Sequence, residues 1–236
     1  MASDRTILAP SSKKTTASSL VYQKLRQDIL SGAFKPGQRL HIELVADRYG
    51  VGTNPVREAL NRLSSLRLVD RHDQRGFFMP PISVDDFRDL VKTRVWLETR
   101  AIEESIAKRD QVWEENLVLA HHRLSRAQWN LPGQGVSGNP EWELRHREFH
   151  TALIANCGSQ RLIAYCDTLM DQSERYRYIV ITSTYPMRIV SGEHRVIMEA
   201  AIDGDIGLAS KRLADHYELT LRIIEGQIAS GVELVE

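Results

Sequence analysis

The feature that most restricts the fold is the helical pattern that fills the chain after Met79. Apolar residues recur there at the three- and four-residue spacing of amphipathic helices, and no alternating strand pattern of useful length follows. The expected helices cover residues 84–108, 111–130, 141–156, 159–183, 187–203 and 206–229. We therefore expect residues 81–236 to form an all-α, antiparallel helical bundle.

The residues up to Pro80 carry shorter segments of a different kind. In order, they predict a helix from Ser19, a helix over 42–49, a helix that starts at Pro55, and strands over 68–71 and 76–79. Leu44 and Val45 are expected to face the interior. Three helices followed by a β-hairpin are the elements of a winged helix-turn-helix, so residues 18–80 are expected to form this unit in a mainly α protein. Residues 1–17, rich in Ser, Thr and Lys, predict a disordered tail.

The third helix carries side chains that can read DNA. In the run GTNPVREALNRLSSL, Asn54 is expected to cap the helix and Pro55 to take its first position. Arg57 and Asn61 lie on the face opposite the apolar residues. Such a helix fits the major groove of B-DNA, where Arg and Asn reach base edges while the wing follows the backbone or the minor groove. A small helical domain with an ordinary solvated polar face is the alternative.

Charge divides at the same point of the chain. Residues 1–80 contain 13 Lys and Arg against 7 Asp and Glu, whereas residues 81–236 contain 18 against 24. This asymmetry indicates a basic module that meets a polyanion and an acidic module with another task. The residues PPIS, 80–83, predict a stiff connector between the two.

Composition also indicates the cellular compartment of the protein. Cys157 and Cys166 are too few for a disulfide framework and are expected to be small buried residues. The first residues lack the apolar core of a signal peptide, and no apolar run approaches the roughly 18 residues of a membrane span. We expect a cytoplasmic protein with no membrane partner.

Four of the eight histidines form a possible metal site. His146 and His150 are four residues apart on one expected helix, so they share a face with Cβ atoms about 5–6 Å apart. His194 and His216 fall on two later helices, and three helices of a bundle can bring such groups to one point. Imidazoles suit a divalent transition metal such as zinc, with nickel or another transition metal as alternatives. The alternative is a set of structural or exposed histidines, which is the commoner case for a pair with this spacing alone.

Ordered motifs in both halves resemble one known family. In the first half they are Gly32, Pro36, Gly37, Leu40, Gly50, Val51, Pro55 to Leu60, Arg62, Leu63, Arg75 and Gly76. In the second half they are Arg94, Leu97, Glu98, Phe149, His150, Glu193, His194, Ala201 to Asp205, and His216. Residues 20–80 thereby resemble the winged helix of the GntR regulators, and the bundle resembles the FCD effector domain of their FadR branch. The run EWELRHREFHTALIANCGS is similar to CsiR-like regulators of small dicarboxylate catabolism.

The resemblance implies site residues in both halves. It implies DNA contacts from Thr53, Asn54, Arg57 and the wing residues His72, Arg75 and Gly76. It places His150, His194 and His216 at the family's histidine metal ligands, with His146 where Asp or Asn is usual. Gly52-Thr53 also stands where the family has Ser-Arg, so the operator half-site is expected to differ.

The resemblance further implies a homodimeric repressor of a catabolic operon that reads an inverted repeat in double-stranded DNA. A small carboxylate effector would place an oxygen on the metal. Arg94 is its expected partner, because an arginine in the interior stripe needs an anion, and a structural bridge to Glu98 is the alternative. Arg175 and Tyr176 are further effector-binding candidates.

Two other functions stay open from the residues. A metal sensor would use the ion itself as the signal. A metalloenzyme would use the histidine-bound ion to activate water or dioxygen. The motifs hold no matched general base, and an enzyme has no need of a basic winged helix, so we expect a regulator and not an enzyme.

Overall fold

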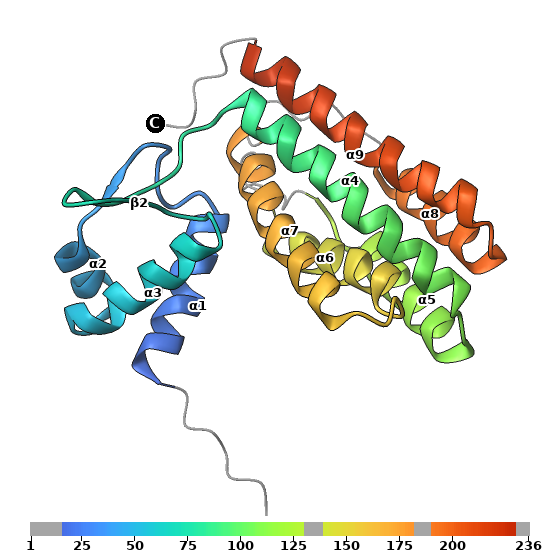
Figure 1. The fold of residues 1–236 in the computed structure, drawn as a ribbon, viewed down its shortest axis with the longest axis horizontal. Helices are drawn as coiled ribbons and strands as arrows, with labels where there is room; N and C mark the ends of the chain where they lie inside the picture. The colour runs from blue at the N-terminus through green and yellow to red at the C-terminus, as the bar shows by residue number, and fades with distance from the viewer. Residues whose placement is uncertain (1–15, 130–138, 182–189, 230–236) are drawn as a thin grey trace, which may run out of the picture.

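The computed structural model describes residues 16–129, 139–181 and 190–229, and it shows two units joined by an extended connector (Figure 1). The small unit contains α1 (Ala17–Leu30), β1 (Arg39–Leu40), α2 (Ile42–Tyr49), α3 (Thr53–Ser65), β2 (Asp70–His72) and β3 (Gly76–Phe78). The large unit contains α4 (Val84–Ala107), α5 (Gln111–Arg126), α6 (Pro140–Ile154), α7 (Gln160–Ile181), α8 (Val190–Asp203) and α9 (Ile206–Ala229). The mainly α fold with a winged helix-turn-helix and a helical bundle is confirmed.

The small unit packs three helices against an antiparallel sheet with the strand order β1-β3-β2. The predicted hairpin is present with other bounds, since its strands cover Asp70–His72 and Gly76–Phe78 in place of 68–71 and 76–79, and it pairs Arg71 with Phe77. The sequence did not predict β1, which is a two-residue strand too short to give a pattern. Val45 is buried but Leu44 is 65% exposed, so its predicted inward position is wrong. Neighbouring residues of a helix point about 100° apart, and in α2 the face that packs inward belongs to Val45 and Ala46.

The start of α3 also differs from the prediction. The helix begins at Thr53 with Gly52 as its N-cap, and no side chain caps it, so Asn54 lies inside the first turn. Pro55 is therefore the third helical residue instead of the first. This position costs little, because the first turn of a helix leaves its backbone N–H groups without intrahelical partners.

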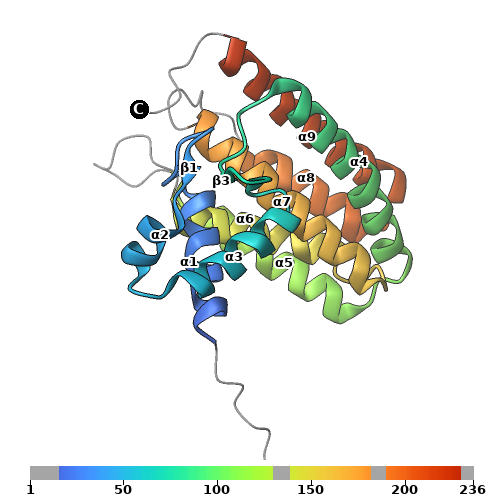
Figure 2. The ribbon, with the colours of Figure 1, turned by 60° about the vertical axis from the view of Figure 1, so that its left-hand side comes forward.

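The bundle surrounds one large apolar core. Helices α4 and α9 lie side by side along one side of it, and α7 lies next to the small unit (Figures 1 and 2). Ser83 caps α4 by accepting a hydrogen bond from the backbone N–H of Asp86. Cys157 and Cys166 are buried and unpaired, as expected. Within the described residues, none of the helices combines the length and the apolar composition that crossing a membrane requires.

Several predicted segments end elsewhere or fall outside the description. Helix α5 ends at Arg126, before the predicted 130. Ala17 is already helical and Thr16 caps α1, so the predicted tail overlaps the helix, while residues 1–15 lie outside the described residues. Most of the predicted loop over 130–140 and the predicted helix start at 187 also lie outside them.

The core of the small unit gives a direct test of this packing. Leu60 is fully buried under the helices, so Leu60→Ala should lower the free energy of unfolding by about 2–5 kcal/mol. The matched control is Leu44→Ala, which removes the same atoms from an exposed site and should change it by less than about 0.5 kcal/mol. Urea denaturation compares the two variants, and equal losses would contradict the packing described.

Candidate metal centre

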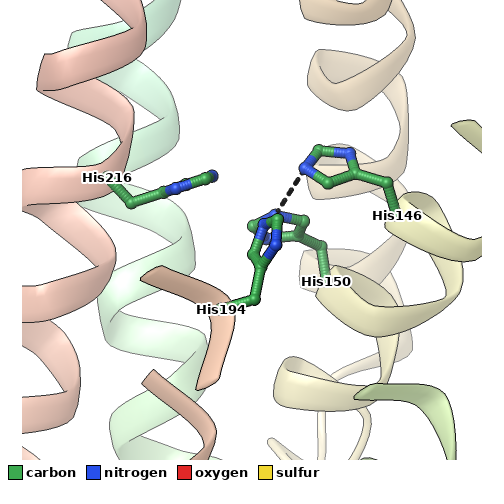
Figure 3. A group of neighbouring side chains, drawn as sticks. All are labelled: His146, His150, His194 and His216. Atoms are coloured by element: carbon green, nitrogen blue, oxygen red, sulfur yellow. Dashed lines mark hydrogen bonds between the residues drawn. The ribbon is translucent and has the colours of Figure 1, made fainter. Parts of the chain in front are cut away.

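Four histidines from three helices meet inside the bundle. His146 and His150 come from α6, His194 from α8 and His216 from α9, and all four rings point toward one another (Figure 3). One nitrogen from each ring lies within 4.8 Å of the corresponding nitrogens of the others. Each residue is at most 5% exposed. The structure thus brings together all four histidines that the sequence singles out.

The local structure of α6 sets the first pair. Asn139 caps this helix by accepting a hydrogen bond from the N–H of Glu141, and Pro140 occupies its first turn. The helix then presents His146 and His150 one turn apart, with their Nε2 atoms 3.1 Å apart. Two nitrogen ligands about 2.0–2.1 Å from one tetrahedral ion lie about 3.3 Å from each other, so this spacing suits a shared ion.

Outer hydrogen bonds orient two of the rings. The Nδ1 atom of His216 lies 2.8 Å from Oε2 of Glu193, and Nδ1 of His150 lies 3.0 Å from the Tyr217 hydroxyl. That hydroxyl donates in turn to Glu98. A partner on Nδ1 fixes the tautomer and leaves Nε2 as the ligating nitrogen, which is the usual support for histidine ligands.

Burial keeps His146 and His150 neutral. Desolvation, followed by the nearby histidines, holds the pKa of His150 well below its usual value. Desolvation likewise lowers the pKa of His146, with His150 and Arg177 adding to the effect. Neutral imidazoles are the form that binds metals. His146 also has a buried Nδ1 with no hydrogen-bond partner among the described residues.

The donor set and the buried nitrogen therefore fit a transition-metal ion. The site offers four imidazoles and no carboxylate among its candidate ligands within the described residues. Zinc, copper, nickel and iron all accept imidazole, and four nitrogens suit a tetrahedral ion.

Arg94 lies in the bundle interior with its guanidinium already engaged. It pairs with Glu98, with an Nε–Oε1 distance of 2.7 Å, and donates to the Ser173 hydroxyl at 3.0 Å. It also stacks over the ring of Tyr217, 4.1 Å from its centroid. The bridge to Glu98, which the sequence left as the alternative, is present, and through Tyr217 it supports His150.

Arg175 and Tyr176 lie at the connector instead of beside the histidines. Arg175 donates to the carbonyl of Pro80, and Tyr176 donates to Asp86 over 2.7 Å. This placement corrects the expectation that they border the effector site. Successive residues of α7 point about 100° apart, so the face that reaches the histidines belongs to the next residue.

That next residue, Arg177, was missed by the sequence reasoning. It is 7% exposed, its Nη2 lies 2.8 Å from Glu143, and its Nε has no hydrogen-bond partner among the described residues. Tyr217 and Glu193 were also missed as supporting residues. Both are direct sequence neighbours of a cluster histidine, which is the signal that could have found them.

The candidate DNA-contacting residues gather on α3 and the wing. Thr53, Asn54, Arg57 and Asn61 are exposed on α3, His72 and Arg75 are exposed at the hairpin, and Gly76 starts β3. Arg57 has no ion pair among the residues that the structure describes. The Asn61 side-chain oxygen accepts a hydrogen bond from Arg71 over 3.2 Å.

A winged helix joined to a helical domain with a buried polar site defines a bacterial regulator class, and the comparisons agree. The chain belongs to the GntR family of bacterial regulatory proteins, whose model matches residues 17–79, and its residues 89–219 match the FCD domain. The chain is therefore a DNA-binding transcription regulator and not an enzyme.

Relatives extend over most of the chain. The uncharacterized HTH-type transcriptional regulator BphR of Paraburkholderia xenovorans (strain LB400) is 36% identical over 203 residues, 86% of this chain and 83% of its own. The HTH-type transcriptional repressor GlaR of Escherichia coli (strain K12) is 30% identical, covering 89% of this chain and 96% of its own. The solved structure of E. coli McbR/YncC has a TM-score of 0.75 at 21% identity, covering 91% of this chain and 100% of its own, which supports the fold.

Neutral, buried imidazoles predict that the metal-free protein loses stability in acid. Histidine in the unfolded chain has a pKa of about 6.5, whereas burial keeps the pKa of His146 and His150 well below it in the folded chain. Below about pH 6.5 the unfolded state takes up protons that the folded state does not. The free energy of unfolding should then fall by up to about 1.4 kcal/mol per pH unit for each histidine.

Urea denaturation of EDTA-treated protein between pH 8 and pH 5 measures this slope. In His150→Gln, the slope of the free energy of unfolding against pH should fall by up to about 1.4 kcal/mol per pH unit, because one buried histidine is removed. His122→Gln, at an exposed site, should leave it unchanged. A stability that does not depend on pH in this window would contradict the neutral, buried state.

Proposed function

We propose that this regulator represses a catabolic operon, binds an inverted-repeat operator as a homodimer, and responds to a small carboxylate held at a histidine-bound metal ion. The observation that carries the proposal is the buried cluster of four histidines inside a domain linked to a winged helix. The repressor name of GlaR supports the direction of control. A symmetric dimer requires a symmetric operator.

On the DNA side, α3 offers the reading surface. Arg57 is exposed at the centre of the polar face and has no competing ion pair among the described residues. Arginine reads guanine through two hydrogen bonds in the major groove. The Asn61 oxygen is held by Arg71, which turns the amide donors of Asn61 outward to base acceptors. Thr53 and Asn54 sit at the helix start, and His72, Arg75 and Gly76 suit backbone contacts from the wing.

On the effector side, the surroundings of the cluster favour an anion. Arg94 and Arg177 both lower the pKa of His150, so both guanidinium charges act on the site. A bound divalent ion would add positive charge, and a coordination number above four would give a carboxylate oxygen a position beside the four histidines. Arg177 is the better second partner. Glu143 holds its Nη2, but its Nε has no hydrogen-bond partner among the described residues, whereas Glu98 and Ser173 engage Nε, Nη1 and Nη2 of Arg94. Small dicarboxylates are the first class to test.

Metal sensing is the second candidate. Its support is that four histidines can fill every position of a tetrahedral ion, as in closed structural sites, and leave none for an effector. A sensor would change its operator affinity when the metal alone is removed. An effector-controlled regulator would keep its affinity under mild chelation and change it when a carboxylate binds.

Removing one ligand tests the metal site. For His150→Ala we expect zinc to lose most of its stabilising effect, because the pair on α6 is broken. At 100 times its dissociation constant, a ligand stabilises the folded state by about 2.7 kcal/mol, which a thermal melt resolves. His122→Ala is the matched control at an exposed site and should respond to zinc like the wild type. Equal zinc responses in both variants would count against the site.

Substitution of one candidate base-contacting residue tests the DNA-binding surface. Arg57→Ala should weaken operator binding by about 1–3 kcal/mol, because a base-edge contact is lost. Fluorescence anisotropy with a duplex obtained by binding-site selection measures the dissociation constant at fixed salt. Arg88→Ala, which removes an exposed arginine from α4, is the control and should bind like the wild type. An unchanged affinity of the Arg57 variant would refute its role.

A further inference from the structure

The two units of the chain do not share an apolar core. The buried residues form two separate clusters, one within residues 21–79 and one within residues 87–224. Between α1 and the α6–α7 pair lies a cavity of about 660 Å³ that both units line. Without a continuous apolar contact, polar contacts must determine how the small unit sits on the bundle.

One buried carboxylate dominates these polar contacts. Asp171 of α7 is 3% exposed and accepts hydrogen bonds from Arg26 of α1, including one of 2.6 Å from Nε to Oδ2. The two Arg26 nitrogens hold both carboxylate oxygens, which is the strong bidentate arrangement. Gly32 of the small unit also packs against the ring of Tyr178 on α7, and a Cβ added at Gly32 would lie 2.7 Å from that ring.

The same carboxylate also binds the helix that carries the histidines. Arg147 of α6 donates to Asp171, and it contacts Glu174 at 2.7 Å and Asp167 at 2.6 Å. Arg147 directly follows His146 in the sequence. A shift of α6 that moves His146 therefore moves Arg147, and with it the carboxylate that holds Arg26.

We propose that Arg26, Asp171 and Arg147 form a coupling chain through which occupancy of the histidine cluster sets the position of the DNA-binding unit. The inference rests on the proposed function, because it requires that the cluster binds a metal ion. An ion bound by the four histidines joins α6 to α8 and α9 and so acts on α6, and Asp171 carries this change to α1. A ligand can shift the DNA-binding unit only through such a difference in contacts between two states.

Hydrogen exchange of the full-length protein, with zinc and with EDTA, tests the chain. In the wild type, zinc should slow exchange in α6, α8 and α9, and it should also change exchange in α1 by at least about threefold, although α1 carries no cluster histidine. In Arg26→Gln, zinc should still slow exchange in the histidine helices, while α1 should no longer respond. Arg26 is partly exposed, so this variant leaves Asp171 paired with Arg147 and the fold intact.

The matched control is Arg88→Gln, which breaks an ion pair with Glu225 inside the bundle and should keep the α1 response. Arg26→Lys keeps one charged donor and should restore part of the response, which a merely structural role would not require. An α1 response that is missing in the wild type, or that persists in Arg26→Gln, would overturn the coupling and leave the metal site standing. If zinc protects no helix, the metal site itself fails, and the coupling fails with it.

Discussion

The bundle depends on keeping four imidazoles buried where α6, α8 and α9 meet. Burying polar rings costs free energy unless they remain uncharged and find hydrogen-bond partners. Desolvation supplies the neutral state of His146 and His150, and Glu193 and Tyr217 supply partners for His216 and His150. The buried pair of Arg94 and Glu98 is tied to this arrangement through Tyr217, so the interior charges and the metal site form one network.

The chain divides its two tasks between the small unit and the bundle. The small unit keeps its own core and exposes α3 and the wing to DNA, while the bundle holds the polar site. Arg175 and Tyr176 hold the connector between the units by donating hydrogen bonds to the carbonyl groups of Pro80 and Ser83. The interface between the two units holds a cavity and a few ion pairs, so a small change in the free energy of these contacts can change how the units are placed relative to each other.

Helical periodicity and the turn residues predicted the two units, and the i, i+4 spacing predicted that His146 and His150 share one face. That His194 and His216 join them was expected from the bundle fold and from the resemblance to the FCD family. The failures have physical reasons. Leu44 is apolar but sits on the wrong side of a short helix, and β1 is too short to show alternation. The order of Arg175, Tyr176 and Arg177 around α7 depends on the packing rotation of that helix, which composition does not encode. The partners of Asp171 lie 24 and 145 residues away, beyond any local pattern.

The proposed function depends on one transition-metal ion that binds all four histidines. X-ray absorption spectroscopy of the zinc-reconstituted protein tests this binding most directly, since it counts the ligands and identifies imidazole by its outer-shell scattering. We expect one ion per chain with nitrogen ligands at about 2.0–2.1 Å and the scattering of four imidazoles. A site dominated by oxygen or sulfur ligands, or zinc that washes away, would contradict it.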